Sequence, residues 1–364
     1  MNSRIVFHID FDYFYAQCEE IRDPKLKTKP VCVCVFSDRG GDSGAIATAN
    51  YSARKFGVKS GIPISLAKKK LESCQDAVFL PVDFEYYTSM SEKSMGIISQ
   101  NADIFEYVGR DEAYLDVTNK VKHDFKVAEH LAQQIKNTIR NETKLSCSFG
   151  ISPNKLISKI ASDYNKPDGM TIVTPEKINS FLEPMKIGKI PGVGKKTEEI
   201  FSKMNITTIK DLQKLDIFSL NKILGRKTAS YIFNASKGID EEPVKIREHN
   251  LQYSKISTLS KDSNDYEFLH QNLLKLSDEV FEIVKKNNKM FRSVGISFVL
   301  TDLSNKTKSK MLRNPSNNID ELKKNLESLL SESLDEKLGL VRRLGVKVSE
   351  LTEITGQSNI TNYF

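Results

Sequence analysis

A run of three charged residues inside a strand-like apolar stretch constrains this chain more than any other feature of its sequence. Residues 108–116 read VGRDEAYLD, with Arg110, Asp111 and Glu112 in the middle. A bare carboxylate is very costly to bury, so an acidic pair in such surroundings is bound to a metal, paired with a cation, or exposed. Because side chains alternate along a strand, Asp111 and Glu112 can serve one site only near a strand end or a turn.

The composition is that of a globular chain with a modest excess of positive charge. The 364 residues are 39% hydrophobic and 28% charged, which argues against a disordered chain and allows several domains. The net charge of +7 permits an anionic partner such as nucleic acid without requiring one. The five cysteines form no C-x-x-C pair, and no segment is typical of a signal peptide or a membrane span. We therefore expect a cytoplasmic protein with no membrane partner.

The first region, residues 1–185, is predicted to mix strands and helices. Residues 4–11 alternate as a strand does, and Asp12 is placed to cap the helix that follows. Further strands are expected in PVCVCVF, GAIATAN and KLSCSFGIS, and Ser152-Pro153 is typical of a helix start. The segment DFKVAEHLAQQIKNTIRNE has helical spacing, with an apolar face predicted at Val127, Leu131, Ile135 and Ile139.

The remaining chain divides into a helical region, a linker, a second mixed domain and a tail. Residues 186–240 are predicted to be all helical, and 241–250 form a charged, Pro-containing linker. Residues 251–350 alternate strand, helix, strand, strand, helix, strand, and residues 351–364 form a polar tail.

Alternation in the 251–350 domain predicts a sheet with helices on one face. The strand residues expected to pack against those helices are Val294, Ile296, Phe298, Leu344, Val346 and Val348. Arg343, Gly345 and Lys347 point away, and Lys306, Lys308 and Lys310 share a face. We expect these cations to form a basic face, which either contacts phosphates or is merely solvated.

Asp10, in HIDFDYFY, joins Asp111 and Glu112 in the first candidate constellation. Magnesium prefers carboxylate oxygens, and two divalent cations can stabilise the attacking and leaving oxygens of a phosphoryl transfer. The carboxylates alone are a weak signal for metal binding, because acidic pairs at strand ends are more often solvated or salt-bridged.

Five longer sequence motifs favour the metal-binding interpretation of these carboxylates. IDFDYFYAQCEE, ATANYSARKFGVKSGIP, DEAYLD, SFGISPNKLISKIASDYNKPDG and IPGVGKKT occur in this order. Together they resemble the Y-family DNA polymerases of the DinB type, over essentially all of the chain to about residue 350. The resemblance implies an α+β multidomain, right-hand polymerase with palm, fingers, helix-hairpin-helix thumb and a little finger made of a four-stranded sheet with two helices. The implied palm and fingers span 1–185, with the fingers inserted at about 20–80. The thumb spans 186–240, the linker 241–250 and the little finger 251–350.

The resemblance also assigns the active site. Asp10, Asp111 and Glu112 match the family's catalytic metal ligands, with the Phe11 carbonyl as a further ligand, whereas Asp12 matches a structural position. The implied cofactor is Mg²⁺, two ions per active site, with Mn²⁺ as a substitute. Tyr15 matches the steric gate that excludes a 2′-hydroxyl. Further substrate contacts match Phe14, Thr48, Tyr51, Arg54 and Lys166, although packed aromatics or solvated surface groups remain the alternative.

Small residues match the roof over the nascent base pair. Ala45, Ala47 and Gly61 would leave space for damaged template bases, at a cost in fidelity, unless they are small only for close packing. In IPGVGKK, Gly192, Gly194 and Lys195 resemble a helix-hairpin-helix that binds DNA phosphates, although any helix-to-helix turn could use them. Arg343 and Lys347 would contribute to DNA binding from the little finger.

The tail matches a clamp-binding peptide. Gln357, Ile360, Tyr363 and Phe364 fit the pattern of peptides that bind the sliding clamp PCNA, and a frayed terminus is the alternative reading.

Gly109 and Arg110 depart from the family pattern, which has a small hydroxyl residue followed by an apolar one. Either Arg110 contacts the DNA backbone or an acidic neighbour, or it is exposed on the opposite face.

The sequence thus predicts a monomeric, template-directed DNA polymerase that copies damaged templates with low fidelity. Its partners would be primer–template DNA, deoxynucleoside triphosphates and the clamp. Two alternatives remain: a two-metal nuclease, and a catalytically weakened, clamp-tethered DNA-binding module.

Overall fold

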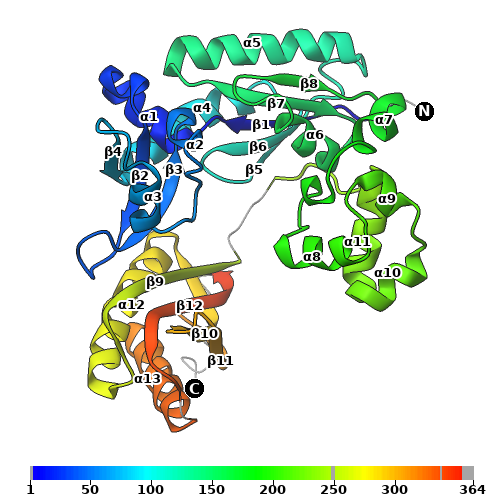
Figure 1. Cartoon of the computed structure of the whole chain (residues 1–364). Helices are drawn as coiled ribbons and strands as arrows, with labels where there is room; N and C mark the ends of the chain where they lie inside the picture. The colour runs from blue at the N-terminus through cyan, green and yellow to red at the C-terminus, as the bar shows by residue number, and fades with distance from the viewer. Residues whose placement is uncertain (1–2, 247–250, 337, 355–364) are drawn as a thin grey trace. The chain divides into compact units, whose positions relative to one another are not determined.

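The computed structural model describes residues 3–246, 251–336 and 338–354, and its contacts divide the chain into two units (Figure 1). The first unit contains residues 1–35 and 45–247, and the second contains 36–44 and 248–364. None of the helices in the described ranges is both long and apolar enough to cross a membrane.

A five-stranded sheet, in the order β5-β6-β1-β7-β8, organises the first unit. The central strand β1 runs antiparallel to both of its neighbours, and β8 runs parallel to β7. The strands are β1 (Val6–Phe11), β5 (Ile104–Tyr107), β6 (Glu112–Asp116), β7 (Cys147–Ser152) and β8 (Met170–Ile172).

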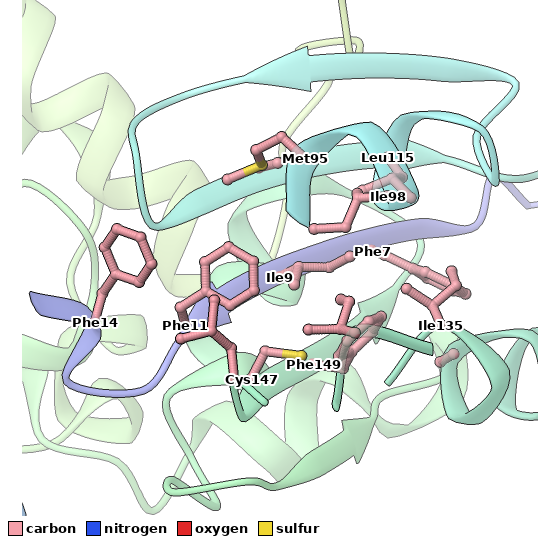
Figure 2. Packing of buried hydrophobic residues seen from close by; sticks show 14 of the residues in the cluster. Phe7, Ile9, Phe11, Phe14, Met95, Ile98, Leu115, Ile135, Cys147 and Phe149 are labelled. Atoms are coloured by element: carbon pink, nitrogen blue, oxygen red, sulfur yellow. The ribbon is translucent and has the colours of Figure 1, made fainter. Parts of the chain in front are cut away.

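One face of this sheet is apolar and covered by the helices α4 (Phe84–Ser99) and α5 (Phe125–Thr143). Figure 2 shows Phe7, Ile9 and Phe11 of β1 packed with residues of both helices, as period-2 alternation on β1 predicts. The face predicted for α5 is partly wrong, because Val127 is 46% exposed. Ala128 and Ala132 are buried beside Ile135 and Ile139, since small side chains let this helix approach the sheet closely.

The opposite face of the sheet carries α6 (Lys155–Ser162), which lies against β7 and β1. Gly150 allows this close approach, because a Cβ at that position would lie 1.8 Å from the Ser158 carbonyl oxygen. The predicted start at Ser152-Pro153 is wrong. The helix begins after Asn154, whose side chain accepts a hydrogen bond from the Ile157 backbone N–H and so satisfies a helix-end donor.

A three-stranded sheet, in the order β3-β2-β4, adjoins α1 (Phe14–Arg22). Its strands are β2 (Val31–Phe36), β3 (Gly44–Ala49) and β4 (Val78–Pro81), accompanied by the short helices η1 (Pro24–Thr28), α2 (Tyr51–Arg54) and α3 (Ile64–Lys70). The prediction that Asp12 caps α1 is wrong. Tyr13 occupies the cap position in a left-handed conformation, and the Asp12 carboxylate instead accepts hydrogen bonds from the Ser146 and Ser148 hydroxyls.

Residues 186–240 are helical, as predicted, and their core around Phe201, Leu212 and Ile232 continues into Leu156, Ile157 and Ile160 of α6. The segments that follow β8 are η2 (Pro175–Lys177), α7 (Ile178–Leu182), η3 (Ile187–Lys189), α8 (Lys195–Lys203), α9 (Ile209–Gln213), α10 (Ile217–Leu224) and α11 (Arg226–Ser236).

The second unit is a four-stranded antiparallel sheet with two helices, as predicted. Its strands, in the order β11-β10-β12-β9, are β9 (Gln252–Ser263), β10 (Lys289–Leu300), β11 (Asn305–Ser316) and β12 (Val341–Glu353). The helices α12 (Tyr266–Lys286) and α13 (Ile319–Asp335) cover one face (Figure 1). The six strand residues predicted for the core are all buried there.

The lysines of β11 share a face, but it is the helix-covered one and not the open one. Directly opposed residues of an antiparallel pair lie on the same face, and Lys308 opposes the buried Ile296. Its ammonium group pairs with Glu332 and Glu336 at the end of α13, which β11 can reach because it is an edge strand. The expectation that Lys306, Lys308 and Lys310 extend the open basic face is therefore wrong.

Candidate active site

The three predicted carboxylates converge at the ends of two neighbouring strands. Asp10 on β1 and Glu112 on β6 are directly opposed in the antiparallel register. Asp111 immediately precedes β6, and its carbonyl accepts a hydrogen bond from the Phe11 N–H at 2.8 Å. The Val108 and Gly109 N–H groups both donate to the Glu112 carbonyl, so a tight turn ends the strand here. The condition that the adjacent acidic pair must lie at a strand end is met.

Asp10 and Asp111 occupy an environment that disfavours their charge. Burial raises the pKa of Asp10 to about 7, partly opposed by Lys166, whose Nζ lies 2.7 Å from Asp10 Oδ1. Burial also raises the pKa of Asp111, and the charge of Glu112 adds to the effect. A site that leaves two carboxylates short of positive charge can accept a cation.

Glu112 is held in its ionised form by two side chains. His8 Nε2 lies 3.2 Å from Glu112 Oε2, and the Lys159 ammonium also contacts that oxygen. The hydrogen bond from His8 and the charge of Lys159 lower the pKa of Glu112 to about 2, although burial opposes the change. His8 is itself fully buried, which lowers its own pKa to about 4, so this imidazole is neutral near pH 7.

The donor set suits a hard divalent cation. Asp10, Phe11, Asp111 and Glu112 lie at one sheet end, and their carboxylate and carbonyl oxygens are the ligand type that magnesium prefers. Across the described ranges, no three His, Cys, Asp or Glu side chains are already gathered in a metal-binding arrangement. Here Lys166 and Lys159 pair with Asp10 and Glu112.

The residues matched to the triphosphate lie beside the carboxylates. Tyr51 is the first residue of α2, and the Arg54 guanidinium lies 4.9 Å from its ring centroid. Burial raises the pKa of Tyr51, and the charges of Asp12, Arg54, Lys166 and Asp10 all act on its hydroxyl. The phenol therefore shares one electrostatic neighbourhood with Asp10 and Lys166. Thr48 is half-buried on β3, three residues before Tyr51.

The two aromatic residues matched to the substrate pocket have different surroundings. Phe14 is 2% exposed and stacks on Phe11, which agrees with the packing alternative for its ring. Tyr15 is half-buried and stacks on Tyr87 of α4, with ring centroids 4.5 Å apart.

Several site residues were missed by the sequence reading. His8 and Lys159 lie beside Glu112. The Asp163 carboxylate lies 2.7 Å from Lys166 Nζ, and the ring of Tyr13 meets that of Tyr51 edge-on. Period-2 spacing places His8 on the same face of β1 as Asp10, and Asp163, at the C-terminal cap of α6, follows Lys159 by four residues. Those two spacings are the features of the sequence that could have pointed to these residues.

The predicted DNA-binding residues lie on loops and faces open to solvent. Gly192 has a positive φ of 84°, Gly194 is the N-cap of α8, and Lys195 begins that helix. Arg343 is exposed and Lys347 half-exposed, and both alternate with the buried residues of β12. The clamp-binding candidates Gln357, Ile360, Tyr363 and Phe364 lie outside the described residues.

Arg110 is half-buried and contacts α4. Its Nε donates a hydrogen bond to Thr88 Oγ1 at 2.9 Å, and its guanidinium carbon lies 5.3 Å from the centroid of the Phe84 ring. Neither partner is acidic, and the side chain is not simply exposed. A Cβ at Gly109 would meet Asp111 Oδ1 at 3.5 Å and Glu112 Cγ at 3.9 Å, both ordinary contacts, so Gly109 is not required sterically.

Three sequence profiles match the chain. That of the impB/mucB/samB family matches residues 9–163, that of the same family's C-terminal domain matches 251–361, and that of the DNA polymerase-iota thumb domain matches 188–240. DNA polymerase IV of Nitrosopumilus maritimus is 68% identical over 364 residues, which is 100% of each chain.

Solved structures agree with the sequence matches. The Y-family DNA polymerase chimera Dbh-Dpo4(243-245)-Dbh is 34% identical with a TM-score of 0.89, covering 96% of this chain and 99% of its own. The insertion ternary complex of Dbh DNA polymerase, with the same identity and coverage, has a TM-score of 0.69. The predicted family and the predicted fold, with its helix-hairpin-helix thumb and little finger, are confirmed. This chain belongs to the impB/mucB/samB family, that is, to the Y-family DNA polymerases of the DinB type.

Proposed function

We propose that this DNA-directed DNA polymerase copies past damaged template bases with low fidelity, by nucleotidyl transfer assisted by two metal ions. The observation that supports the proposal best is the meeting of Asp10, Asp111 and Glu112 at one sheet end, beside Tyr51 and Lys166. A nuclease would need the carboxylates but would have no use for a triphosphate cluster next to them.

The metal ligands are Asp10, Asp111, Glu112 and the Phe11 carbonyl. Two Mg²⁺ ions, or Mn²⁺ as a substitute, supply charge stabilisation for the attacking 3′-oxygen and the departing pyrophosphate. His8 and Lys159 hold the Glu112 carboxylate ionised and fixed in direction before the substrates arrive. Lys166 pairs with Asp10 in the free protein, and its ammonium would be available to the triphosphate if a bound cation neutralised Asp10 instead.

We propose that the nucleotide pocket attracts the triphosphate and excludes the 2′-hydroxyl of a ribonucleotide. Tyr51 and Arg54, on a short helix beside the carboxylates, hold the phosphates with Thr48 and Lys166. The Tyr15 ring would meet a 2′-hydroxyl on the incoming sugar, so ribonucleotides would be rejected by a clash. The small side chains Ala45 and Ala47 and the unobstructed Gly61 leave room for an altered base pair, and the same room reduces fidelity.

The proposed partners follow from the same assignment. Residues 1–185 would act as palm and fingers, 186–240 as thumb and 251–350 as little finger, with 241–250 as the linker. Gly192, Gly194, Lys195, Arg343 and Lys347 would hold primer–template DNA through its phosphates. We further propose that the chain works as a cytoplasmic monomer and that residues 351–364 bind the sliding clamp PCNA.

Primer extension tests this function. The wild type, Asp111→Ala and the control Asp76→Ala, which removes an exposed carboxylate, are compared on an intact template and on one with an abasic site. Wild type and Asp76→Ala should extend both templates, and Asp111→Ala neither. Extension that survives in Asp111→Ala would contradict the metal site. Binding of primer–template without extension would favour the binding module, and shortening of a labelled primer without nucleotides would favour the nuclease.

A further inference from the structure

Arg110 connects the segment that carries the catalytic carboxylates to helix α4. It directly precedes Asp111, and both of its side-chain contacts, with Thr88 and Phe84, are to α4. Phe84 and Thr88 are four residues apart, so they lie next to each other on one face of the helix. The hydrogen bond to Thr88 fixes the position of the guanidinium, and this position places it over the Phe84 ring.

Phe84 in turn forms one wall around Tyr15. The rings of Tyr15 and Phe84 meet edge-on, with centroids 6.1 Å apart and an interplanar angle of 81°. The other wall is Tyr87, which stacks on Tyr15 at 4.5 Å and 14°. Two aromatic residues three positions apart on α4 therefore flank Tyr15, whose ring also lies 5.6 Å from that of Phe14.

The side chains that form these two walls are not held in place equally firmly. Tyr87 is fully buried, and its hydroxyl donates a hydrogen bond to Glu19 Oε1 at 2.7 Å. Phe84 is the first residue of α4 and is 44% exposed, so burial does little to restrict its rotamer. The contact with Arg110 is what restrains the exposed wall, because a cation over a ring favours one ring orientation.

We propose that Arg110 is a positioning residue for sugar discrimination: through Phe84 it holds Tyr15 in the orientation that excludes a 2′-hydroxyl. This inference rests on the proposed role of Tyr15 as the sugar gate. A steric gate discriminates only if its ring cannot turn aside, since a clash relieved by a small rotation costs little. The departure from the family pattern beside the catalytic pair therefore has a defined role. Arg110 positions Tyr15 without contacting the reacting atoms.

The test is single-turnover insertion of a deoxynucleotide and of the matching ribonucleotide. Arg110→Met keeps an unbranched apolar stem but removes both the hydrogen bond and the cation. We expect it to raise ribonucleotide efficiency relative to deoxynucleotide by about threefold to thirtyfold, the range of a partly exposed cation–π contact. Deoxynucleotide insertion should stay within about twofold of wild type, as expected for a residue that does not touch the reacting atoms. Arg110→Lys, which keeps a cation, should restore part of the discrimination.

Two further variants test the route through Phe84. Phe84→Leu should lower discrimination as Arg110→Met does, and combining the two should add little, because both remove the same contact. Thr88→Val removes the hydroxyl that orients Arg110, together with its hydrogen bond to the Phe84 carbonyl, and should give a smaller effect in the same direction. These substitutions also give independent readings should Arg110→Met fold poorly, which thermal melting would reveal.

Other outcomes overturn the proposal. Equal loss of deoxynucleotide and ribonucleotide insertion in Arg110→Met would make Arg110 merely structural. Weaker primer–template binding with unchanged discrimination would make it a DNA contact. Additive effects of Arg110→Met and Phe84→Leu would exclude the route through Phe84. Tyr15→Ala separates this inference from the proposed function: if that variant gains no ribonucleotide insertion, the gate assignment itself is wrong and the role of Arg110 falls with it.

Discussion

Glu106 and Lys155 form a buried ion pair between β5 and the first residue of α6. Lys155 Nζ lies 2.9 Å from Glu106 Oε2 and 3.1 Å from Oε1, and the two side chains are 8% and 0% exposed. Glu106 also accepts a hydrogen bond from the Lys245 N–H, so the pair ties the segment after α11 to the sheet.

Removing one partner of this pair should strongly destabilise the first unit. Lys155→Met removes the ammonium that pairs with the fully buried Glu106 carboxylate and should lower the free energy of unfolding by about 3–5 kcal/mol. The matched control is Lys210→Met, which removes an exposed partner of Glu183 and should cost less than about 1 kcal/mol. Urea denaturation followed by tyrosine fluorescence measures both. Equal, small effects would show that the buried pair contributes no more than a surface one.

Replacement by asparagine should have different effects at Asp12 and at Asp10. Asp12 is 1% exposed and accepts hydrogen bonds from Ser146, Ser148 and the Asp168 N–H. Asp12→Asn leaves one acceptor oxygen and should lower stability by about 1–3 kcal/mol, the cost of a poorly satisfied buried group. Asp10→Asn removes a proposed metal ligand and should abolish primer extension. Loss of extension in Asp12→Asn at a temperature where the variant remains folded would contradict a purely structural role.

Gly150 should be intolerant of any side chain. A Cβ there would lie 1.8 Å from the Ser158 carbonyl and 2.5 Å from the Ser162 N–H, so α6 would have to move with Lys159. We expect Gly150→Ala to cost about 3 kcal/mol, at the upper end for overpacking, and to slow extension. Gly96→Ala is the control, because no atom lies within 4 Å of its added Cβ in the exposed part of α4. It should instead gain about 0.5–1 kcal/mol from the better helix propensity of alanine.

Glu20 should make stability depend on pH. Its side chain is buried and accepts hydrogen bonds from Asn50 at 2.8 Å and Tyr13 at 3.1 Å. Burial raises the pKa of this carboxyl above its ordinary 4.5, although those hydrogen bonds oppose the change. The folded chain therefore binds more protons than the unfolded chain above pH 4.5, and stability falls as pH rises through the folded-state pKa.

Glu20→Gln cannot ionise, so its stability relative to wild type should increase as pH rises above about 4.5 and level off beyond the folded-state pKa. Urea midpoints measured from about pH 4 to pH 7 follow this difference, with the exposed Glu85→Gln as control. A difference that stays constant with pH would show that burial does not perturb Glu20.

The sequence by itself determined the order of the elements, most of the core and the identity of the acidic site. Alternation along β10 and β12 predicted the buried residues correctly, because the orientation of a side chain on a strand follows from the local backbone. Asp10, Asp111 and Glu112 could be named because their types and motifs are local too.

Only the tertiary structure decided which segments meet. The side chains of Asp12 and Lys308 found partners on distant segments, and the spacing along the chain carries no information about such distances. The same reason explains Arg110, whose contacts lie 22 and 26 residues earlier on α4, and Glu112, which is held by His8 and Lys159 from two other elements. Periodicity specifies the face on which a residue lies, but packing between elements determines what that residue contacts.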